Sequence, residues 1–272
     1  MAETVHTRRL TGIRLREILP GQIRHSCQGY TLIELALVLV IIGVLASVGL
    51  KSLGAISQTT RIEETRQEME RLACAIAGNT SLVSGGSRTD FGYVGDVGSL
   101  PPNLDALVTN PGGYATWDGP YLVDAFTSGG ANTEFKYNAW GIAYTYSGGN
   151  SITSSGGGLT LTKQLANSTS DLLRNQVRVV VTDLDHTPPG TTYSDSVRFV
   201  LSVPNGTGSY VNRSQTPRDD GLVSFDSVPI GIHELRLIYL PTADTLLRKV
   251  AVYPGENSYL EISLAENIWS GS

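Results

Sequence analysis

Three residues near the N-terminus have the types and spacing for a covalent processing step followed by charge pairing. Gly29 precedes Tyr30, and Glu34 lies in an otherwise apolar run. Cleavage of the Gly29–Tyr30 peptide bond would leave an ammonium group on Tyr30, with Glu34 as the fifth residue of the remaining chain. A carboxylate among apolar residues in a membrane is costly unless a counter-ion compensates it. We therefore expect Glu34 of one subunit to pair with the Tyr30 ammonium of the next and to set the register of a polymer.

The element that must position these residues is an apolar helix. Residues 31–50 read TLIELALVLVIIGVLASVGL, with Glu34 as their one charged side chain. Twenty helical residues span about 30 Å, the thickness of a hydrocarbon core. A secretory signal peptide fits poorly, because the run is too long and no small-residue cleavage site follows it. A plain single-pass anchor remains the alternative, and the acidic Glu34 argues against it.

The run from Gly29 to Glu34, followed by an apolar helix, resembles the class III signal of type IV prepilins and pseudopilins. The resemblance implies that a prepilin peptidase cuts between Gly29 and Tyr30 and methylates the new amine. It also implies a single-pass protein of the bacterial inner membrane whose C-terminal region is periplasmic, or extracellular in a filament. The implied partners are identical or homologous pilin subunits, the prepilin peptidase, the inner-membrane assembly platform and the lipid bilayer. Two features depart from the family pattern: Tyr30 replaces the commoner Phe, and the leader is long.

Charge is distributed unevenly along the chain. Residues 1–29 carry five arginines and two glutamates, a net charge of +3. Because the whole chain has a formal charge of −5, residues 30–272 carry −8. A basic head fits the cytoplasmic side of a membrane. An acidic body argues against nucleic acid as a partner. We expect residues 1–29 to be a cleaved leader.

The helix is expected to continue as an amphipathic stalk, giving a transmembrane and stalk helix over residues 30–78. The period of the apolar side chains is helical. These residues are Ile56, Ile62, Met69, Leu72, Ala73 and Ile76. Cys74 lies near the apolar stripe and is expected in the core. Because Cys27 would leave with the leader, no intrachain disulfide is expected.

Residues 79–166 are predicted to form a small α+β part that packs an antiparallel sheet on the stalk. Short strands are expected at Glu134–Tyr137 and Ile142–Tyr146, with a last strand at Leu159–Thr162. The segments LPPNLDALV, WDGPYL and NAWGIAYTY occur in this order. They resemble the globular part of the G-type pseudopilin of type II secretion, and the resemblance covers residues 29–150.

That family usually carries a calcium-binding loop rich in Asp after its last strand. Here no Asp or Glu occurs between Glu134 and Asp171, and Asn138 stands where the family prefers Asp. Calcium prefers several oxygen ligands, normally including carboxylates. Asp118 and Asp124 are the weak calcium candidates that remain, and no other cofactor is expected.

Residues 167–176 are predicted to be a linker, and residues 177–272 an all-β sandwich. The expected strands are Val177–Thr182, Val197–Val203, Leu222–Phe225, Glu234–Leu240, Lys249–Tyr253 and Tyr259–Leu264. The run from Asp220 to Leu235 resembles carboxypeptidase-regulatory-like (transthyretin-like) modules. Such a module implies a fold and no activity. The predicted fold class is therefore α+β: a pilin-like part followed by a β-sandwich.

No enzymatic site is predicted. His233 fits a strand position, His186 fits a polar turn, and no Gly-x-Ser-x-Gly, Walker or His-Glu-x-x-His motif occurs. The sequence favours a structural subunit of a type II secretion pseudopilus or of a type IV pilus-like filament. The alternative is a minor pilin or adhesin that displays the C-terminal sandwich as a binding module.

Overall fold

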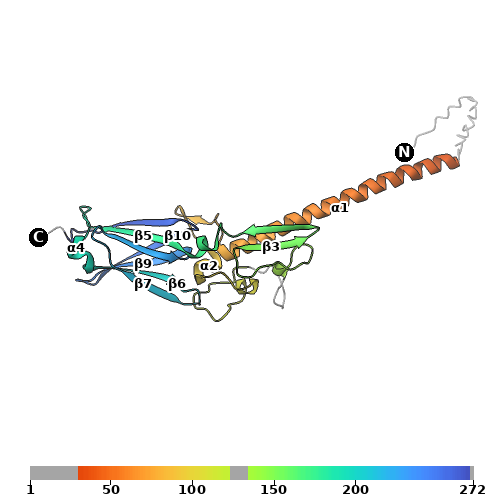
Figure 1. Cartoon of the computed structure of the whole chain (residues 1–272). Coiled ribbons are helices and arrows are strands. Elements are labelled where there is room, and N and C mark those ends of the chain that lie inside the picture. Colours follow the sequence, from red (N-terminus) through yellow and green to blue (C-terminus); the bar gives the residue numbers. More distant parts are fainter. Residues whose placement is uncertain (1–29, 123–133, 270–272) are drawn as a thin grey trace, which may run out of the picture. The chain divides into compact units, whose positions relative to one another are not determined.

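The computed structural model describes residues 30–122 and 134–269, and for residues 48–55 it describes the backbone alone. The chain divides into two compact units, Met1–Leu53 and Gly54–Ser272. An N-terminal helix is followed by a region rich in β-strands, so the α+β class is confirmed (Figure 1). Gly29 and Asp124 lie outside the described residues.

Helix α1 (Leu32–Ala77) is 46 residues long. Its end at Ala77 follows from Gly78, whose φ of 84° is the left-handed conformation that glycine tolerates best. The Arg88 side chain donates to the Ala77 carbonyl through Nη2 and to the Asp90 carbonyl through Nε, the latter at 2.6 Å. A cation thus caps the Ala77 carbonyl, which the helix leaves unpaired, and ties it to the segment at Asp90. In the part of the chain that the structure describes, no helix combines the length and apolar character needed to cross a membrane.

Short elements surround the C-terminal part of α1. They are β1 (Val83–Ser84), β2 (Ser87–Arg88), α2 (Gly92–Val97), η1 (Leu104–Leu107) and η2 (Glu134–Lys136). The prediction of a strand at Glu134–Tyr137 is wrong, since this segment contains the 3-10 helix η2. The strand expected at Ile142–Tyr146 is also wrong, because only isolated bridges form, Tyr137 with Ala143 and Thr145 with Thr153.

The side chain of Asn138 explains the missing strand pair. Its Oδ1 accepts from the amides of Trp140 and Ile142 at 2.9 and 3.0 Å. These local bonds replace the ladder that two strands would need. Apart from the short β1 and β2, the strands of this part lie further along the chain.

Strand β3 (Ser151–Gly156) pairs antiparallel with β4 (Leu159–Gln164), which confirms the strand expected at Leu159–Thr162 and adds one that was not expected. Gly157 and Gly158 form the two-residue turn with φ of 58° and 79°, as a type I′ turn requires. Gln58 Nε2 donates to the Gly157 carbonyl at 2.9 Å, so the turn lies against α1 (Figure 1).

Helix α3 (Thr169–Leu173) lies within the segment expected to be a linker. Ser168 and Asp171 form a reciprocal capping box at its start. The Ser168 amide donates to Asp171 Oδ2 at 2.9 Å, and the Asp171 amide donates to Ser168 Oγ at 3.2 Å. Strand β5 begins two residues after α3 ends.

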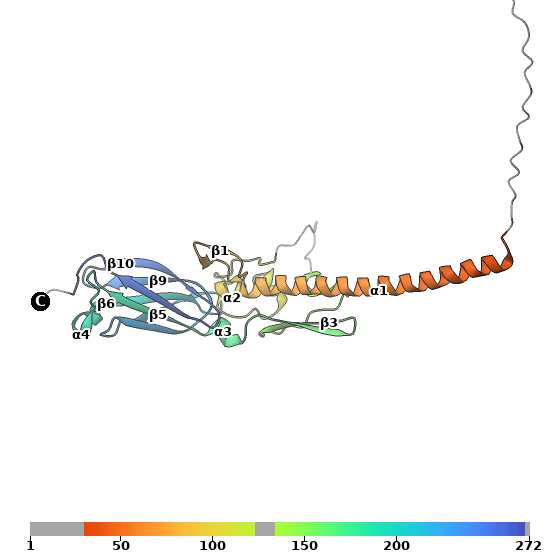
Figure 2. The same cartoon turned by 90° about the horizontal axis from the view of Figure 1, so that it is seen from above.

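The C-terminal strands form two sheets (Figures 1 and 2). The sheet of four strands has the order β10-β9-β6-β7, and the sheet of three has the order β11-β5-β8. The strands are β5 (Asn175–Thr182), β6 (Val197–Pro204), β7 (Tyr210–Gln215), β8 (Leu222–Val228), β9 (Gly231–Tyr239), β10 (Asp244–Val252) and β11 (Asn257–Ser263). Two short helical elements, α4 (Gly190–Tyr193) and η3 (Ser194–Ser196), precede β6. Six of the strands were predicted, whereas the exposed edge strand β7 was not.

One buried cluster joins the two sheets. It combines apolar side chains of β5, β8 and β11 with those of β6, β9 and β10, including Val179, Phe199 and Leu235, each at 0% exposure. Their alternation with exposed residues along each strand is the period that places one face of a strand inside. A second cluster surrounds the end of α1 and includes Ile76, Tyr93 and Ile230.

Candidate functional site

The start of α1 is a reciprocal cap built from Thr31 and Glu34. The Glu34 amide donates to Thr31 Oγ1 at 3.3 Å, and the Thr31 amide donates to a Glu34 carboxylate oxygen at 3.4 Å. This is the Ser/Thr-x-x-Glu capping box, in which a side chain and a backbone amide satisfy each other. The carboxylate therefore faces the N-terminal end of the helix. Tyr30, the residue expected to carry the new amine, is 79% exposed and two residues before α1.

The following turns of α1 form an apolar surface that the chain does not cover. Every residue from 32 to 47 is exposed. The large apolar side chains range from 45% exposure at Val38 to 89% at Leu32. Soluble proteins rarely leave so continuous an apolar surface in water, because its hydration is unfavourable. This surface needs lipid or other protein to cover it.

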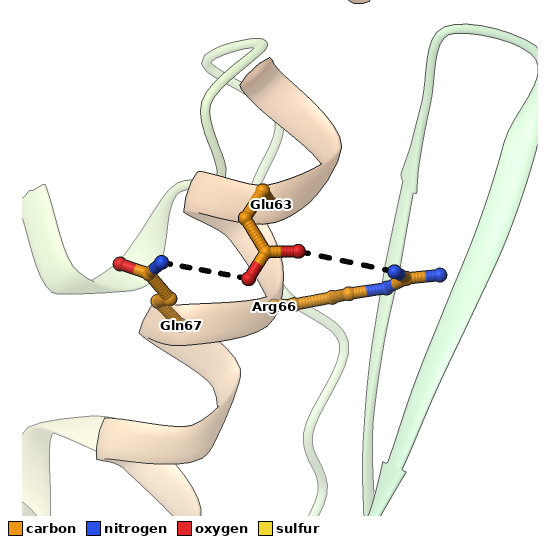
Figure 3. A network of polar contacts seen from close by, with 3 residues as sticks. All are labelled: Glu63, Arg66 and Gln67. Atoms are coloured by element: carbon orange, nitrogen blue, oxygen red, sulfur yellow. Dashed lines mark hydrogen bonds and ion pairs between the residues drawn. The ribbon is translucent and has the colours of Figure 1, made fainter. Parts of the chain in front are cut away.

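Further along, α1 has a polar exposed face and a buried one. On the exposed face, a carboxylate oxygen of Glu63 lies 3.9 Å from Arg66 Nη1, and Gln67 Nε2 donates to Glu63 at 3.5 Å (Figure 3). Such pairs three and four residues apart contribute only a few tenths of a kcal/mol each. On the buried face, Met69 and Ile76 are at most 2% exposed. The amphipathic pattern predicted for this segment is confirmed from Met69 to Ile76, whereas Ile56, expected on the same apolar stripe, is 60% exposed.

Three polar residues of α1 make contacts that the apolar pattern did not predict. Thr65 is fully buried and accepts from the Ala139 amide at 3.3 Å. Glu68 accepts from the Tyr144 hydroxyl at 2.6 Å. Lys163 of β4 forms an ion pair with Glu70. Hydrogen bonds and an ion pair, as well as apolar contacts, therefore hold residues 139–163 against the helix.

Of the two calcium candidates, Asp118 is described and is exposed. Its backbone amide donates to the Tyr121 hydroxyl at 3.2 Å, and that hydroxyl donates to Asp96 at 2.9 Å. Burial raises the pKa of Asp96 to about 6, although the Tyr121 hydrogen bond opposes the shift. Within residues 30–122 and 134–269, no three His, Cys, Asp or Glu side chains are grouped to hold a metal.

Among the described residues, two further side chains that could act as a base or a nucleophile are packed against other parts of the fold: His233 and Cys74. His233 is 2% exposed, and its Nε2 lies 2.8 Å from the Pro229 carbonyl oxygen. Burial lowers the pKa of His233, so the imidazole is neutral and donates to that carbonyl. Burial, helped by the Glu70 charge, raises the pKa of the Cys74 thiol, which makes it a poor nucleophile. His186 occupies a turn with a φ of 64°.

The comparisons with known proteins agree with the N-terminal features. Residues 24–50 match the family model described as the prokaryotic N-terminal methylation motif. The type II secretion system core protein G of Xanthomonas campestris pv. campestris is 35% identical over 107 residues. This similarity covers 39% of the chain and 64% of the relative, just under two thirds of its length.

Among solved structures, the Bacillus anthracis TIE protein is 16% identical with a TM-score of 0.29, covering 46% of this chain and 24% of its own. BcpA, the major pilin subunit of Bacillus cereus, is 11% identical with a TM-score of 0.24, covering 42% and 36%. Scores this low carry no argument about the fold. The methylation motif and the partial similarity to a secretion core protein make the N-terminal part of the chain similar to type IV pilin-like proteins and pseudopilins.

Proposed function

We propose that the chain is a structural subunit of a type II secretion pseudopilus or of a type IV pilus-like filament. A prepilin peptidase removes residues 1–29 and methylates Tyr30. The mature subunit is held in the inner membrane by the N-terminal part of α1, with the C-terminal region in the periplasm, and the assembly platform adds it to a growing filament. The subunit carries out no catalysis of its own.

The observation that carries this proposal is the uncovered apolar surface of residues 32–47, which begins three residues after the expected cleavage site. A bilayer can cover that surface before assembly, and the same surfaces of neighbouring subunits can cover it afterwards. A simple membrane anchor would explain the apolar residues equally well. The Thr31–Glu34 cap accounts for an acidic side chain at the start of the helix in either case, so the two functions differ in the amine that processing creates beside it.

Glu34 has a different task before and after assembly in this proposal. Within one chain its carboxylate accepts from the Thr31 amide, a bond to a neutral group. When a neighbouring subunit arrives, its Tyr30 ammonium offers a stronger, charge-assisted partner. The pairing then selects one register, because a displaced subunit would leave a charge uncompensated in an apolar surrounding.

Mass spectrometry of the purified full-length product tests the processing step. We expect the polypeptide to begin at Tyr30 with one methyl group on its amine. A product that keeps the arginine-rich head, or that begins at any other residue, overturns the proposal and leaves a tethered domain. The measurement needs no knowledge of the cargo or of the filament's helical parameters.

A second candidate function is display of the C-terminal region by a minor pilin or adhesin. The similarity to the secretion core protein spans only 39% of the chain, so most of this protein has no counterpart in it. We propose that the two C-terminal sheets form a β-sandwich of the carboxypeptidase-regulatory-like kind. Their shared buried cluster supports this interpretation. Neighbouring genes for a secretin and a secretion ATPase would favour secretion, and those for a retraction ATPase or adhesins would favour display.

A further inference from the structure

Asn138 lies at the centre of a hydrogen-bonded junction in the part that packs on α1. Its side chain is buried, with 5% exposure. Its Oδ1 accepts hydrogen bonds from two backbone amides, as described above. Its Nδ2 donates to Ser154 Oγ and to the Ser155 carbonyl, both at 2.8 Å. The carboxamide therefore connects the loop at residues 138–142 to strand β3.

All four hydrogen-bonding positions of this carboxamide are occupied. An Asn side chain has two N–H donors and an oxygen that accepts two bonds, and each is used here. The adjacent Ala139 amide donates to Thr65 of α1, which extends the junction to the helix. No acceptor position is left on the oxygen to bind a cation. An ionised Asp at this position could keep the two accepted bonds but could not donate to β3.

The residues present do not fit the calcium site that the G-type resemblance implies. Calcium takes six to eight oxygen ligands, and carboxylates usually supply several. The segment from Ser147 to Gly158 contains no carboxylate and folds instead into β3 and the Gly157–Gly158 turn. Asp118, the calcium candidate that the structure describes, is exposed, and its backbone amide donates to the Tyr121 hydroxyl at 3.2 Å.

We propose that the Asn138 carboxamide takes the place of a calcium ion in this chain. Its four hydrogen bonds close the loop at residues 138–142 and hold the β3–β4 hairpin next to α1. The folded protein is then independent of calcium at concentrations that would fill a calcium site. This proposal concerns folding stability and stands whether or not the subunit forms filaments.

Thermal unfolding of the full-length chain in dodecyl maltoside micelles tests calcium independence directly. We expect Tm to agree within about 1 °C between 1 mM EDTA and 5 mM CaCl2, concentrations chosen to empty or fill a site with the sub-millimolar affinity typical of structural calcium sites. Isothermal titration with CaCl2 should show no saturable binding. A rise in Tm of about 5 °C with calcium, or saturable binding of one ion per chain, overturns the proposal.

The variant Asn138→Asp tests the carboxamide itself. Loss of two buried donor bonds should lower Tm by about 5 °C at pH 7 in either solution. Asn205→Asp is the matched control, because the side-chain bonds described for Asn205 are all accepted by Oδ1, including those from the amides of Thr207 and Ser209. It should unfold like the wild type. Equal unfolding of the two variants overturns the role of the Nδ2 donors, and if Asn138→Asp does not fold, the wild-type calcium comparison still decides.

Discussion

The backbone amide of Ile230 donates to the carbonyl of Leu172 at 2.9 Å, and both side chains are completely buried. Ile230 occupies the turn between β8 and β9, whereas Leu172 belongs to α3. The Ile230 side chain enters the cluster formed by α1 and α2 instead of the cluster between the two C-terminal sheets. The C-terminal strands therefore share a core with the part that packs on α1.

We expect Ile230→Ala to destabilise the part of the chain from Gly54 to Ser272 as one cooperative unit. Truncation of a fully buried Ile costs about 2–5 kcal/mol, since it removes apolar contacts and leaves a cavity. Guanidinium unfolding followed by circular dichroism should show a lower midpoint and a single transition. Ile232→Ala is the matched control, because Ile232 is 44% exposed and its truncation should cost less than about 1 kcal/mol. Two separate transitions in Ile230→Ala would show that the C-terminal strands and the part that packs on α1 unfold independently.

The half-buried carboxyl of Asp96 should make stability depend on pH. Its pKa is raised from 3.8 to about 6, so between these values the folded state holds a proton that the unfolded state has released. Stability must then fall as pH rises from about 4 to about 6, and remain lower above that range. Because Asp96 is only partly buried, we expect a loss of about 1–2 kcal/mol.

The variant Asp96→Asn should remove that pH dependence. Its side-chain oxygen can still accept the Tyr121 hydrogen bond, and no charge is left to desolvate. Urea midpoints measured at pH 4.5 and pH 7 should converge in this variant and differ in the wild type. Asp195→Asn, at an exposed position, serves as the control and should behave like the wild type. If the pH dependence persists in Asp96→Asn, another group is responsible for it.

Replacement of Gly29 should block processing if the peptidase needs close approach to the peptide backbone at this position. In Gly29→Ala we expect accumulation of the unprocessed chain, heavier by the mass of residues 1–29, on immunoblots and in mass spectra. Gly43→Ala is a suitable control, because a Cβ atom at Gly43 would contact nothing within 4 Å. Normal maturation of Gly29→Ala would argue against cleavage at this bond.

Removal of the acidic side chain should separate processing from assembly. Glu34→Ala is expected to insert and to be cleaved normally, while filaments fail to form or form in the wrong register. Sheared-filament fractions and electron microscopy measure this outcome. Glu63→Ala, which removes an exposed carboxylate further along the same helix, should assemble like the wild type. Normal filaments from Glu34→Ala would contradict the charge-pairing mechanism.

Local patterns predicted the helix and most strands because neighbouring residues decide them. The 3.6-residue period of Met69, Leu72 and Ile76 requires only that one face of a helix be buried. Alternation along β5, β6 and β9 likewise requires only a sheet with a covered face. The edge strand β7 has no such alternation, since nearly all of its residues are exposed. It forms because β6 offers it backbone partners.

The unpredicted features depend on contacts between distant residues or on side-chain bonds to backbone. Burial of the polar Thr65 needs the Ala139 amide, 74 positions away. Burial of Ile230 among residues of α1, α2 and α3 depends on β8 and β9, which place the turn between them there. The Thr31–Glu34 cap could have been predicted, because a Thr three residues before a Glu at the start of an apolar run is a recognised helix-start pattern.

The close approach of two glycines gives the C-terminal strands a stiff attachment. A Cβ atom at Gly231, where φ is 148°, would lie 3.1 Å from the Gly95 carbonyl oxygen, and Phe91 packs with its ring centroid 6.0 Å from that of Tyr253. A pulling force applied to β9 or β10 is therefore carried by packed backbone into α2 and the adjoining end of α1. We expect tension on the two sheets to reach α2 without first extending a slack tether.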